Sequence, residues 1–177
     1  MPENVFFAIF ALVKRKRIIV WLLPLLMMVG CVTGQERAEQ QAKMKKAVAE
    51  AVASRHLHID IRSMSTHRYG SKMVTSDFFL ELQGDTLCSD LPYWGQAYQA
   101  PVGSPSIGLN FEAPILRYSE SRPKANKTQL ELDVRTQEDT YHYLIELYDT
   151  GESYIRVRSL NRDPISFDGT IGKCVKN

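Results

Sequence analysis

The spacing of apolar residues along the chain changes near Arg55 from a period close to four to a period of two. From Glu36 to Arg55 the sequence is rich in alanine, glutamate, glutamine and lysine, which are good helix formers, and it contains neither glycine nor proline. This segment is predicted to form an amphipathic helix that lies on the domain, with its charged face solvated or, as the alternative, bound to a partner. The apolar stripe of this helix consists of Met44, Ala47, Val48, Ala51 and Val52.

Beyond Arg55, short runs of residues alternate between apolar and polar side chains, which is the pattern of half-buried β-strands. Turn-forming sequences separate these runs, and Gly84-Asp85 is typical of a two-residue hairpin turn. The predicted strands are residues 57–62, 78–83, 86–91, 107–111, 115–118, 129–136, 140–148, 154–159 and 165–171. The other predicted turns are residues 122–126, 137–139, 149–152 and 161–164.

The order of these elements predicts the fold class. Many short strands joined by tight turns, with no helical crossover between them, indicate an antiparallel meander. A single flat sheet of so many strands is unfavourable, so the meander is expected to curl into a partly closed barrel or to fold into a two-layer sandwich. The protein is therefore predicted to be mainly β with one N-terminal helix, which covers one opening or one face of the sheet.

The first residues have the pattern of an export signal. The basic cluster Lys14 to Arg17 precedes the apolar run Ile18 to Val29, and a glycine and Cys31 follow. The run is too short to span a bilayer, which needs about 20 apolar residues in a helix. Met28-Val29-Gly30-Cys31 resembles the lipobox of bacterial lipoproteins, in which the cysteine is acylated, with Met28 where leucine is usual.

This signal divides the chain into a signal peptide at residues 1–30, a lipidated Cys31 with a spacer to residue 35, and a single domain at residues 36–177. Covalent lipid would supply the membrane affinity that a spanning helix otherwise provides. Val32 follows the cysteine without an acidic run, and by resemblance to known sorting patterns this favours the periplasmic face of the outer membrane. The alternative is that Cys31 ends an ordinary signal peptide or lies in a membrane anchor.

Removal of the signal also changes the net charge. The whole chain carries a formal charge of +2, and residues 1–30 contain four cations and one glutamate, so the mature chain carries about −1. The strands have no stripe rich in lysine and arginine. Because binding to nucleic acid depends on such a positive surface, a nucleic-acid partner is not expected.

Two cysteines remain once Cys31 is assigned to the lipid. An exported protein can oxidise Cys88 and Cys174 to a disulfide, and closing so long a loop would stabilise the fold. Cys174 lies close to the end of the chain, so free thiols are the equal alternative.

His56, His58 and Asp60 fall on one face of the first predicted strand, at a spacing that could present two imidazoles and a carboxylate to zinc. Such spacing is common by chance, and solvated polar residues on an outer strand face are the favoured interpretation. A metal site would need His67 or His142 to complete it, and nothing in the sequence places either one nearby. No metal or other cofactor is therefore expected.

The usual sequence signals of catalysis are absent. There is no Gly-x-Ser-x-Gly elbow and no glycine loop that opens a helix for phosphate. Glu81, Glu131, Asp133 and Glu146 lie on predicted strands, but each alternates with a larger apolar set and is expected to point outward. The sequence therefore predicts no enzyme, and a hydrolase is kept only as the last alternative.

The stretch from Asp90 to Gly103 is unusually rich in aromatic residues, proline and glycine. Tyr93, Trp94 and Tyr98 can bury ring area while their polar tips find partners, so the favoured interpretation is a loop that plugs the core at the end of the sheet. The alternative is an aromatic rim around a pocket for a ligand or partner, with Arg162 as a possible contact.

Two segments resemble a known family. Leu91-Pro92-Tyr93-Trp94-Gly95-Gln96-Ala97-Tyr98 and Asn161-Arg162-Asp163-Pro164-Ile165-Ser166-Phe167-Asp168-Gly169 are similar to two segments of the domain-of-unknown-function family numbered 4251. The resemblance extends from the predicted helix to Ile171, and it implies an outer-membrane lipoprotein of Bacteroidetes. The family has no assigned activity, so the resemblance implies no catalytic residues.

Together these patterns predict a lipid-anchored periplasmic domain that binds or docks on another envelope protein without catalysis. The first alternative is a small carrier that holds an apolar ligand inside the β domain, and the second is a hydrolase. The sequence does not determine an oligomeric state.

Overall fold

The computed structural model describes residues 34–75, 77–98 and 108–172 of the chain. By their contacts, residues 34–42 and the described residues from 43 onward belong to two different units. A helix occupies residues 34–54, which confirms the predicted helix, and its residues 34–42 are exposed. Residues 43–54 belong to the same unit as the strands.

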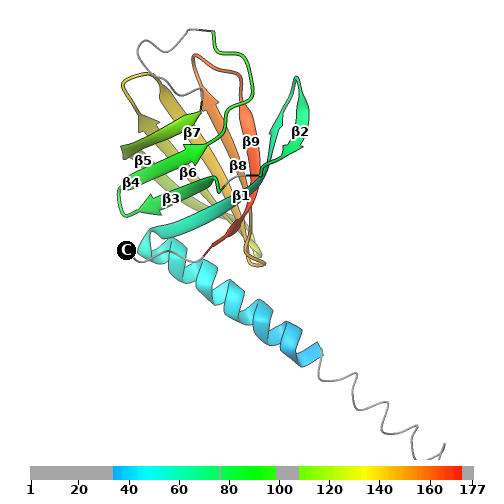
Figure 1. The fold of residues 1–177 in the computed structure, drawn as a ribbon. Coiled ribbons are helices and arrows are strands. Elements are labelled where there is room, and N and C mark those ends of the chain that lie inside the picture. The colour runs from blue at the N-terminus through cyan, green and yellow to red at the C-terminus, as the bar shows by residue number, and fades with distance from the viewer. Residues whose placement is uncertain (1–33, 76, 99–107, 173–177) are drawn as a thin grey trace, which may run out of the picture. The chain divides into compact units, whose positions relative to one another are not determined.

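The described residues form nine antiparallel strands in a meander, and strands β1 and β9 pair to close eight of them into a barrel (Figure 1). The fold class is therefore confirmed, and the barrel is closed. β2 is the additional strand, paired with the second half of β1. The strands are β1 (His56–Thr66), β2 (Gly70–Met73), β3 (Phe79–Gln83), β4 (Thr86–Leu91), β5 (Leu109–Lys124), β6 (Lys127–Arg135), β7 (Thr140–Tyr148), β8 (Glu152–Ser159) and β9 (Ile165–Ile171).

β1 is longer than its alternation predicts because it contains a bulge. Leu57, Ile59 and Ile61 point inward, and after the bulge between Ile61 and Ser63 the inward positions are Met64 and Thr66. A bulge inserts one residue and so moves the next side chains to the other face. The alternation of apolar and polar residues therefore ends at the bulge, although β1 continues beyond it. The short β2, which pairs with the second half of β1, was not predicted.

β5 also differs from the prediction. The structure has one strand where two were predicted, and its turn is confined to Ala125 and Asn126 instead of residues 122–126. The register of β5 against β6 shifts between Ile115 and Arg117 and again between Ser121 and Lys124. Pro114 directly precedes the first shift, and Pro123 lies within the second. Proline is tolerated in strands at such irregular positions, so neither proline ends β5.

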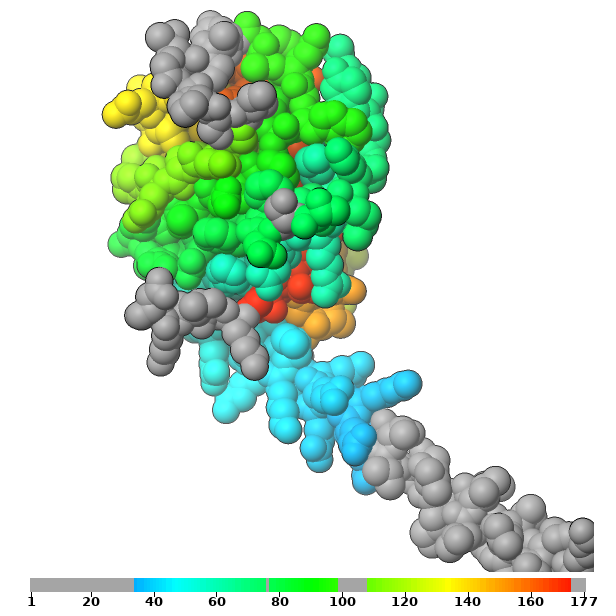
Figure 2. Space-filling model, viewed as in Figure 1, coloured from blue at the N-terminus to red at the C-terminus, as the bar shows by residue number. Residues whose placement is uncertain are grey.

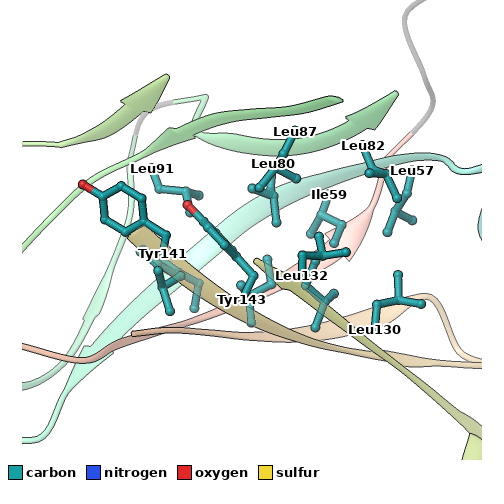
Figure 3. Packing of buried hydrophobic residues seen from close by; sticks show 14 of the residues in the cluster. Leu57, Ile59, Leu80, Leu82, Leu87, Leu91, Leu130, Leu132, Tyr141 and Tyr143 are labelled. Atoms are coloured by element: carbon teal, nitrogen blue, oxygen red, sulfur yellow. The ribbon is translucent and has the colours of Figure 1, made fainter. Parts of the chain in front are cut away.

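The inward-facing side chains fill the barrel with apolar atoms (Figure 3). Among the fully buried side chains of the described residues, Tyr143 is the one that is both large and polar, and its hydroxyl lies 3.3 Å from that of Ser89. Burial raises the pKa of Tyr143, so its phenol stays neutral. The fully buried large side chains include Leu57, Ile59, Leu80, Leu82, Leu87, Leu91, Leu109, Leu130, Leu132, Tyr143, Ile145, Leu147, Ile155 and Phe167.

One end of the barrel, here called the helix end, carries the β3–β4, β5–β6 and β7–β8 turns and the residues that join the helix to β1. Val48 and Val52 of the helix are buried in the core cluster, whereas Met44 and Ala47 of the predicted stripe are exposed. Lys45 forms an ion pair with Asp149 at 3.0 Å. The apolar contact of the helix is therefore narrower than predicted.

Arg55 ends the helix in a left-handed conformation, with φ of 52°. Its carbonyl accepts a hydrogen bond from the Gly84 N–H at 2.8 Å, and its guanidinium pairs with Asp85 at 2.6 Å. Gly84 has φ of 61°, which confirms the predicted hairpin turn. The opposite end of the barrel is called the loop end, and it carries residues 67–69, 91–98, 136–139 and 160–164.

Candidate binding surface

The two segments that the sequence singled out lie side by side at the loop end. The Tyr98 N–H donates to the Asn161 carbonyl at 2.7 Å, and the Asp163 N–H donates to the Gln96 carbonyl at 3.0 Å. Ala97 and Arg162 form an antiparallel bridge between them. Segments far apart in the chain are thus joined through their backbones and form one surface element.

Arg162 is the buried cation of this element, with only 6% of its surface exposed. Its guanidinium donates to a carboxylate oxygen of Glu138 and to the Gly108 carbonyl, each at 3.4 Å. The same group lies 5.2 Å from the centre of the Tyr93 ring. Arg162 therefore ties four loop segments together, as a buried guanidinium with several donors can.

Tyr93 faces this guanidinium from the aromatic loop. Its hydroxyl donates to the Gln96 carbonyl at 2.7 Å and lies 3.3 Å from the Asp163 carbonyl. Burial, followed by the negative charge of Asp163, raises the pKa of Tyr93 to about 12. The phenol is therefore a neutral hydrogen-bond donor that holds the loop, and it packs against the core.

Tyr98 and Asp163 form the outer part of the element. The Tyr98 hydroxyl donates to the Asp163 carboxylate, which also accepts a hydrogen bond from the Gln96 N–H at 3.3 Å. The hydrogen bond from Tyr98 lowers the pKa of Asp163, and the same bond raises the pKa of Tyr98. Tyr98 is 64% exposed, so its ring remains available at the surface.

Trp94 connects the loop to the hairpin of β1 and β2. Its ring stacks on Tyr69 with 5.4 Å between the ring centres, and the Lys72 ammonium lies 5.8 Å from the indole. Trp94 is half-buried and packs against the core cluster, whereas Tyr69 is exposed. The hairpin and the aromatic loop therefore form one continuous surface, which we call the aromatic surface, with Tyr69, Trp94 and Tyr98 as its rings.

The structure thus brings together all four residues predicted as a possible rim. Tyr93 and Arg162 are used in internal contacts, while Trp94 and Tyr98 reach the surface. Sequence reasoning missed three exposed large apolar side chains at or beside this end: Tyr69, Met73 and Leu160. Gly70 is a signal that could have indicated a turn after β1. Such a turn would have placed Tyr69 at the surface and Met73 on a second strand beyond it.

The weak zinc candidates lie on the outer face of β1. His56 Nδ1 lies 2.7 Å from the Ser54 carbonyl, and His58 Nε2 lies 3.1 Å from an Asp60 oxygen. The His58 ring also stacks on Phe79. Within the described residues, no group of three histidine, cysteine or acidic side chains is arranged to hold a metal ion.

The carboxylates that were considered for hydrolysis alternate with buried neighbours on β3, β6 and β7 and so face away from the core. Glu146 forms an ion pair with Lys127 at 2.8 Å, and Asp133 lies 2.5 Å from His142 Nδ1. The described strands therefore bring no pair of these carboxylates together inside the barrel.

A polar cavity of about 540 Å³ is lined by residues of β7, β8 and β9 and by Arg62 of β1. Its carboxylates already have partners, because Glu146 pairs with Lys127 and Asp168 accepts a hydrogen bond from Ser63 at 2.9 Å. The Tyr154 hydroxyl donates to Ser166. The cavity is lined by Arg62, Glu146, Tyr148, Glu152, Ser153, Tyr154, Asp168 and Gly169.

Cys88 is a half-buried cysteine on β4 that forms no disulfide with another described residue. It lies opposite Glu81 of β3 and Glu112 of β5 in the barrel register. Burial and then these carboxylates raise the pKa of Cys88, which disfavours the reactive thiolate. Cys174 lies outside the described residues, so its pairing with Cys88 stays a prediction.

The predicted signal peptide and the lipidated Cys31 also lie outside the described residues. Within the described part of the chain, no helix combines the length and the apolar character that a bilayer span requires.

The sequence profile of a family described as Domain of unknown function (DUF4251) matches residues 39–171. The chain belongs to the DUF4251 family. The crystal structure of a DUF4251 protein from Bacteroides eggerthii superposes with a TM-score of 0.57 at 11% sequence identity, covering 74% of this chain and 90% of that one. At this identity the likeness shows a shared fold. A search of curated proteins found no match.

The DUF4251 match confirms the resemblance that the two segments indicated, and it includes both of them. In this DUF4251 protein the structure adds that the two segments are hydrogen-bonded neighbours at the loop end. No activity comes with the family description.

Proposed function

We propose that this DUF4251 protein is a non-catalytic docking module of the cell envelope, held by lipid on Cys31 at the periplasmic face of the outer membrane. Its docking site is the aromatic surface of the loop end. The observation that carries the proposal is that large aromatic and apolar side chains are exposed there on a framework fixed by the buried Arg162. Such exposed side chains on rigid supports are typical of protein-binding sites.

The packing of the barrel supports docking over the carrier hypothesis. Leu132, Tyr143 and Ile145 have no exposed surface, so no space the size of a water molecule touches them. An apolar ligand would have to displace side chains of this kind to enter. A native mass spectrum of the purified protein is expected to give the bare protein mass, and an extra mass that disappears on denaturation would favour the carrier.

The side chains that a hydrolase would need also favour a non-catalytic role. Of the described carboxylates on the outer face, Glu146 pairs with Lys127, Asp133 lies beside His142, and Glu131 accepts a hydrogen bond from Gln129. The raised pKa of Cys88 works against a nucleophilic thiolate. The Tyr93 phenol is neutral and is already engaged as a hydrogen-bond donor to the Gln96 carbonyl, so it does not supply a base for hydrolysis.

The anchor is supported by the basic cluster, the apolar run and the lipobox-like end of residues 1–31. Cells grown with a labelled fatty acid are expected to incorporate the label into the wild-type protein. The Cys31→Ala variant is expected to lose the label and to remain as unprocessed precursor. A labelled Cys31→Ala protein would contradict the proposed anchor.

Crosslinking in intact cells tests the docking site. A photoreactive amino acid in place of Tyr98 or Leu160 is expected to give a discrete crosslinked product with one envelope protein. Leu116 is the matched control, because it is equally large and exposed but lies on the side of β5, away from the aromatic surface. The same product in the same yield from Leu116 would contradict the proposed site.

A further inference from the structure

β2 is an open edge on an otherwise closed barrel. Within the described residues β2 pairs with β1 alone, and all four of its residues are exposed. The hairpin that it forms with β1 projects beside the loop end in Figure 1, and its teal atoms form part of the surface in Figure 2. The second half of β5, from Ile115 to Lys124, also pairs with one described neighbour only, but it runs toward the helix end. β2 is therefore the open edge beside the aromatic surface, where a further strand could be added.

The register of the hairpin identifies the backbone groups on this edge. Val74 N–H donates to the Arg62 carbonyl at 2.9 Å, and the pairs that follow are Met73 with Ser63 and Lys72 with Met64. Hydrogen-bonded pairs alternate in an antiparallel ladder, so Lys72 directs its N–H and carbonyl toward β1. Ser71 and Met73 direct theirs to the opposite side, which is the open edge.

The charge of the hairpin indicates the chemistry of a partner. Around the turn of the hairpin, residues 66–72 contain His67, Arg68 and Lys72 and no aspartate or glutamate, whereas Arg62 lines the polar cavity together with Glu146, Glu152 and Asp168. This basic stretch contrasts with a mature chain whose formal charge is about −1. The positive charge of Arg68 acts on the Asp163 carboxylate, which already accepts hydrogen bonds from Tyr98 and Gln96. The complementary ligand is therefore acidic.

The side chains beside the edge offer contacts on both faces of an added strand. Lys72 pairs with the buried Met64 and so lies on the face that Trp94 covers. Met73 is 70% exposed on the other face. Alternate side chains of an incoming strand would lie beside Lys72 and the aromatic surface on one face and beside Met73 on the other.

We propose that β2 binds an extended, acidic segment of the partner protein as an additional antiparallel strand. The inference rests on the proposed function and specifies how docking at the aromatic surface occurs. Main-chain hydrogen bonds to Ser71 and Met73 provide affinity, and Arg68 and Lys72 select acidic side chains. The opposing interpretation is that the short length of β2 and the charge of Lys72 serve to prevent other strands from pairing with this edge.

Proline at the open edge tests the proposal. Met73→Pro removes an N–H that the hairpin ladder does not use, whereas Met73→Ala shortens the same side chain and keeps the N–H. A displayed library of random peptides, each longer than β2, is selected against the full chain purified in detergent. The selected peptides are expected to be enriched in aspartate and glutamate. Their affinity is expected to fall roughly tenfold in Met73→Pro relative to Met73→Ala.

Charge reversal tests the acidic specificity separately. Lys72→Glu is expected to weaken the same peptides and to reduce the dependence of their affinity on salt, because a screened attraction is lost. Circular dichroism and thermal unfolding establish that Met73→Pro and Lys72→Glu remain folded. Peptides without acidic enrichment, a library that yields no binder, or equal affinity for Met73→Pro and Met73→Ala would each overturn strand addition.

The crosslinking sites separate this inference from the proposed function. If Met73→Pro leaves the cellular crosslinks from Tyr98 and Leu160 unchanged, docking at the loop end stands and strand addition is wrong. If those positions give no crosslink in the wild-type protein, the proposed function itself fails. Loss of the crosslinks in Met73→Pro but not in Met73→Ala supports both.

Discussion

The two ends of the barrel are closed by different chemistry. At the helix end, Val48 and Val52 cover the core with apolar atoms, and the ion pair between Lys45 and Asp149 lies at the surface. At the loop end, the cover is a network of backbone and aromatic groups around the buried Arg162. Apolar cover needs only volume, whereas a buried guanidinium needs each of its partners in place.

This difference predicts how each end responds to mutation. Loss of a methyl group at the helix end leaves a small cavity, and its cost is limited to that volume. Loss of the cation at the loop end leaves Glu138, the Gly108 carbonyl and the Tyr93 ring without their shared contact. The loop end is therefore expected to be the more sensitive to single substitutions, although it is also the surface proposed to bind.

The largest effect is expected at Arg162. Arg162→Ala should lower the free energy of unfolding by about 3 kcal/mol, because it removes a buried guanidinium whose N–H groups donate to Glu138 and to the Gly108 carbonyl. Arg162→Lys keeps the charge but not the planar fork, so it should cost less than the alanine variant. Denaturant unfolding followed by far-UV circular dichroism measures both. A loss below about 1 kcal/mol in Arg162→Ala would show that the loop end does not depend on this group.

A smaller effect is expected at the helix end. Val52→Ala should lower the free energy of unfolding by about 2 kcal/mol, through lost apolar burial and the cavity that remains. Ala47→Ser is the control, since Ala47 is exposed on the same helix, and it should change the stability by about 0.5 kcal/mol or less. Equal losses in the two variants would mean that the helix does not cover the core in solution.

Trp94 is expected to contribute about 1.5 kcal/mol, less than a fully buried tryptophan, because it is half-buried between Tyr69 and the core. Trp94→Ala should lower the melting temperature, and Trp94→Phe should restore most of it by keeping a stacked ring. Unchanged stability in Trp94→Ala would contradict the predicted plug and leave the ring with a role in binding alone.

The two ends also differ in how far the sequence predicts them. At the helix end, the stripe with Val48 and Val52 and the Gly84-Asp85 turn are local patterns, and the structure confirms both. At the loop end, the aromatic and Asn161–Pro164 segments were each identified, but their pairing depends on barrel closure between β1 and β9. No local pattern encodes that closure.

β2 is a second element that local sequence patterns do not predict. Its four residues, Gly70 to Met73, are exposed and have no apolar alternation, so periodicity does not distinguish them from a loop. They form a strand because β1 continues past its bulge and offers an edge. The part of the candidate site that depends on this hairpin, including Tyr69, therefore became visible only in the three-dimensional arrangement.

The smallest effect, and the one that distinguishes the two ends by pH, is expected at Asp163. Its folded-state pKa is lowered from 3.8, mainly by the Tyr98 hydrogen bond, so its contribution is present above that value and is lost as pH falls through the folded pKa. Tyr98, with its pKa raised above 10.0, contributes below that value and loses its contribution as pH rises through its folded pKa.

Asp163→Asn should therefore lower the melting temperature slightly at neutral pH. The difference from wild type should shrink as pH falls below 3.8 and disappear once the pH is below the folded-state pKa of Asp163. Val52→Ala should show no such convergence, because the apolar cover that it weakens carries no titrating group. Melting curves of the three proteins across this range measure both trends. A constant difference between Asp163→Asn and wild type down to the most acidic pH would mean that the bond between Tyr98 and Asp163 does not hold the loop end.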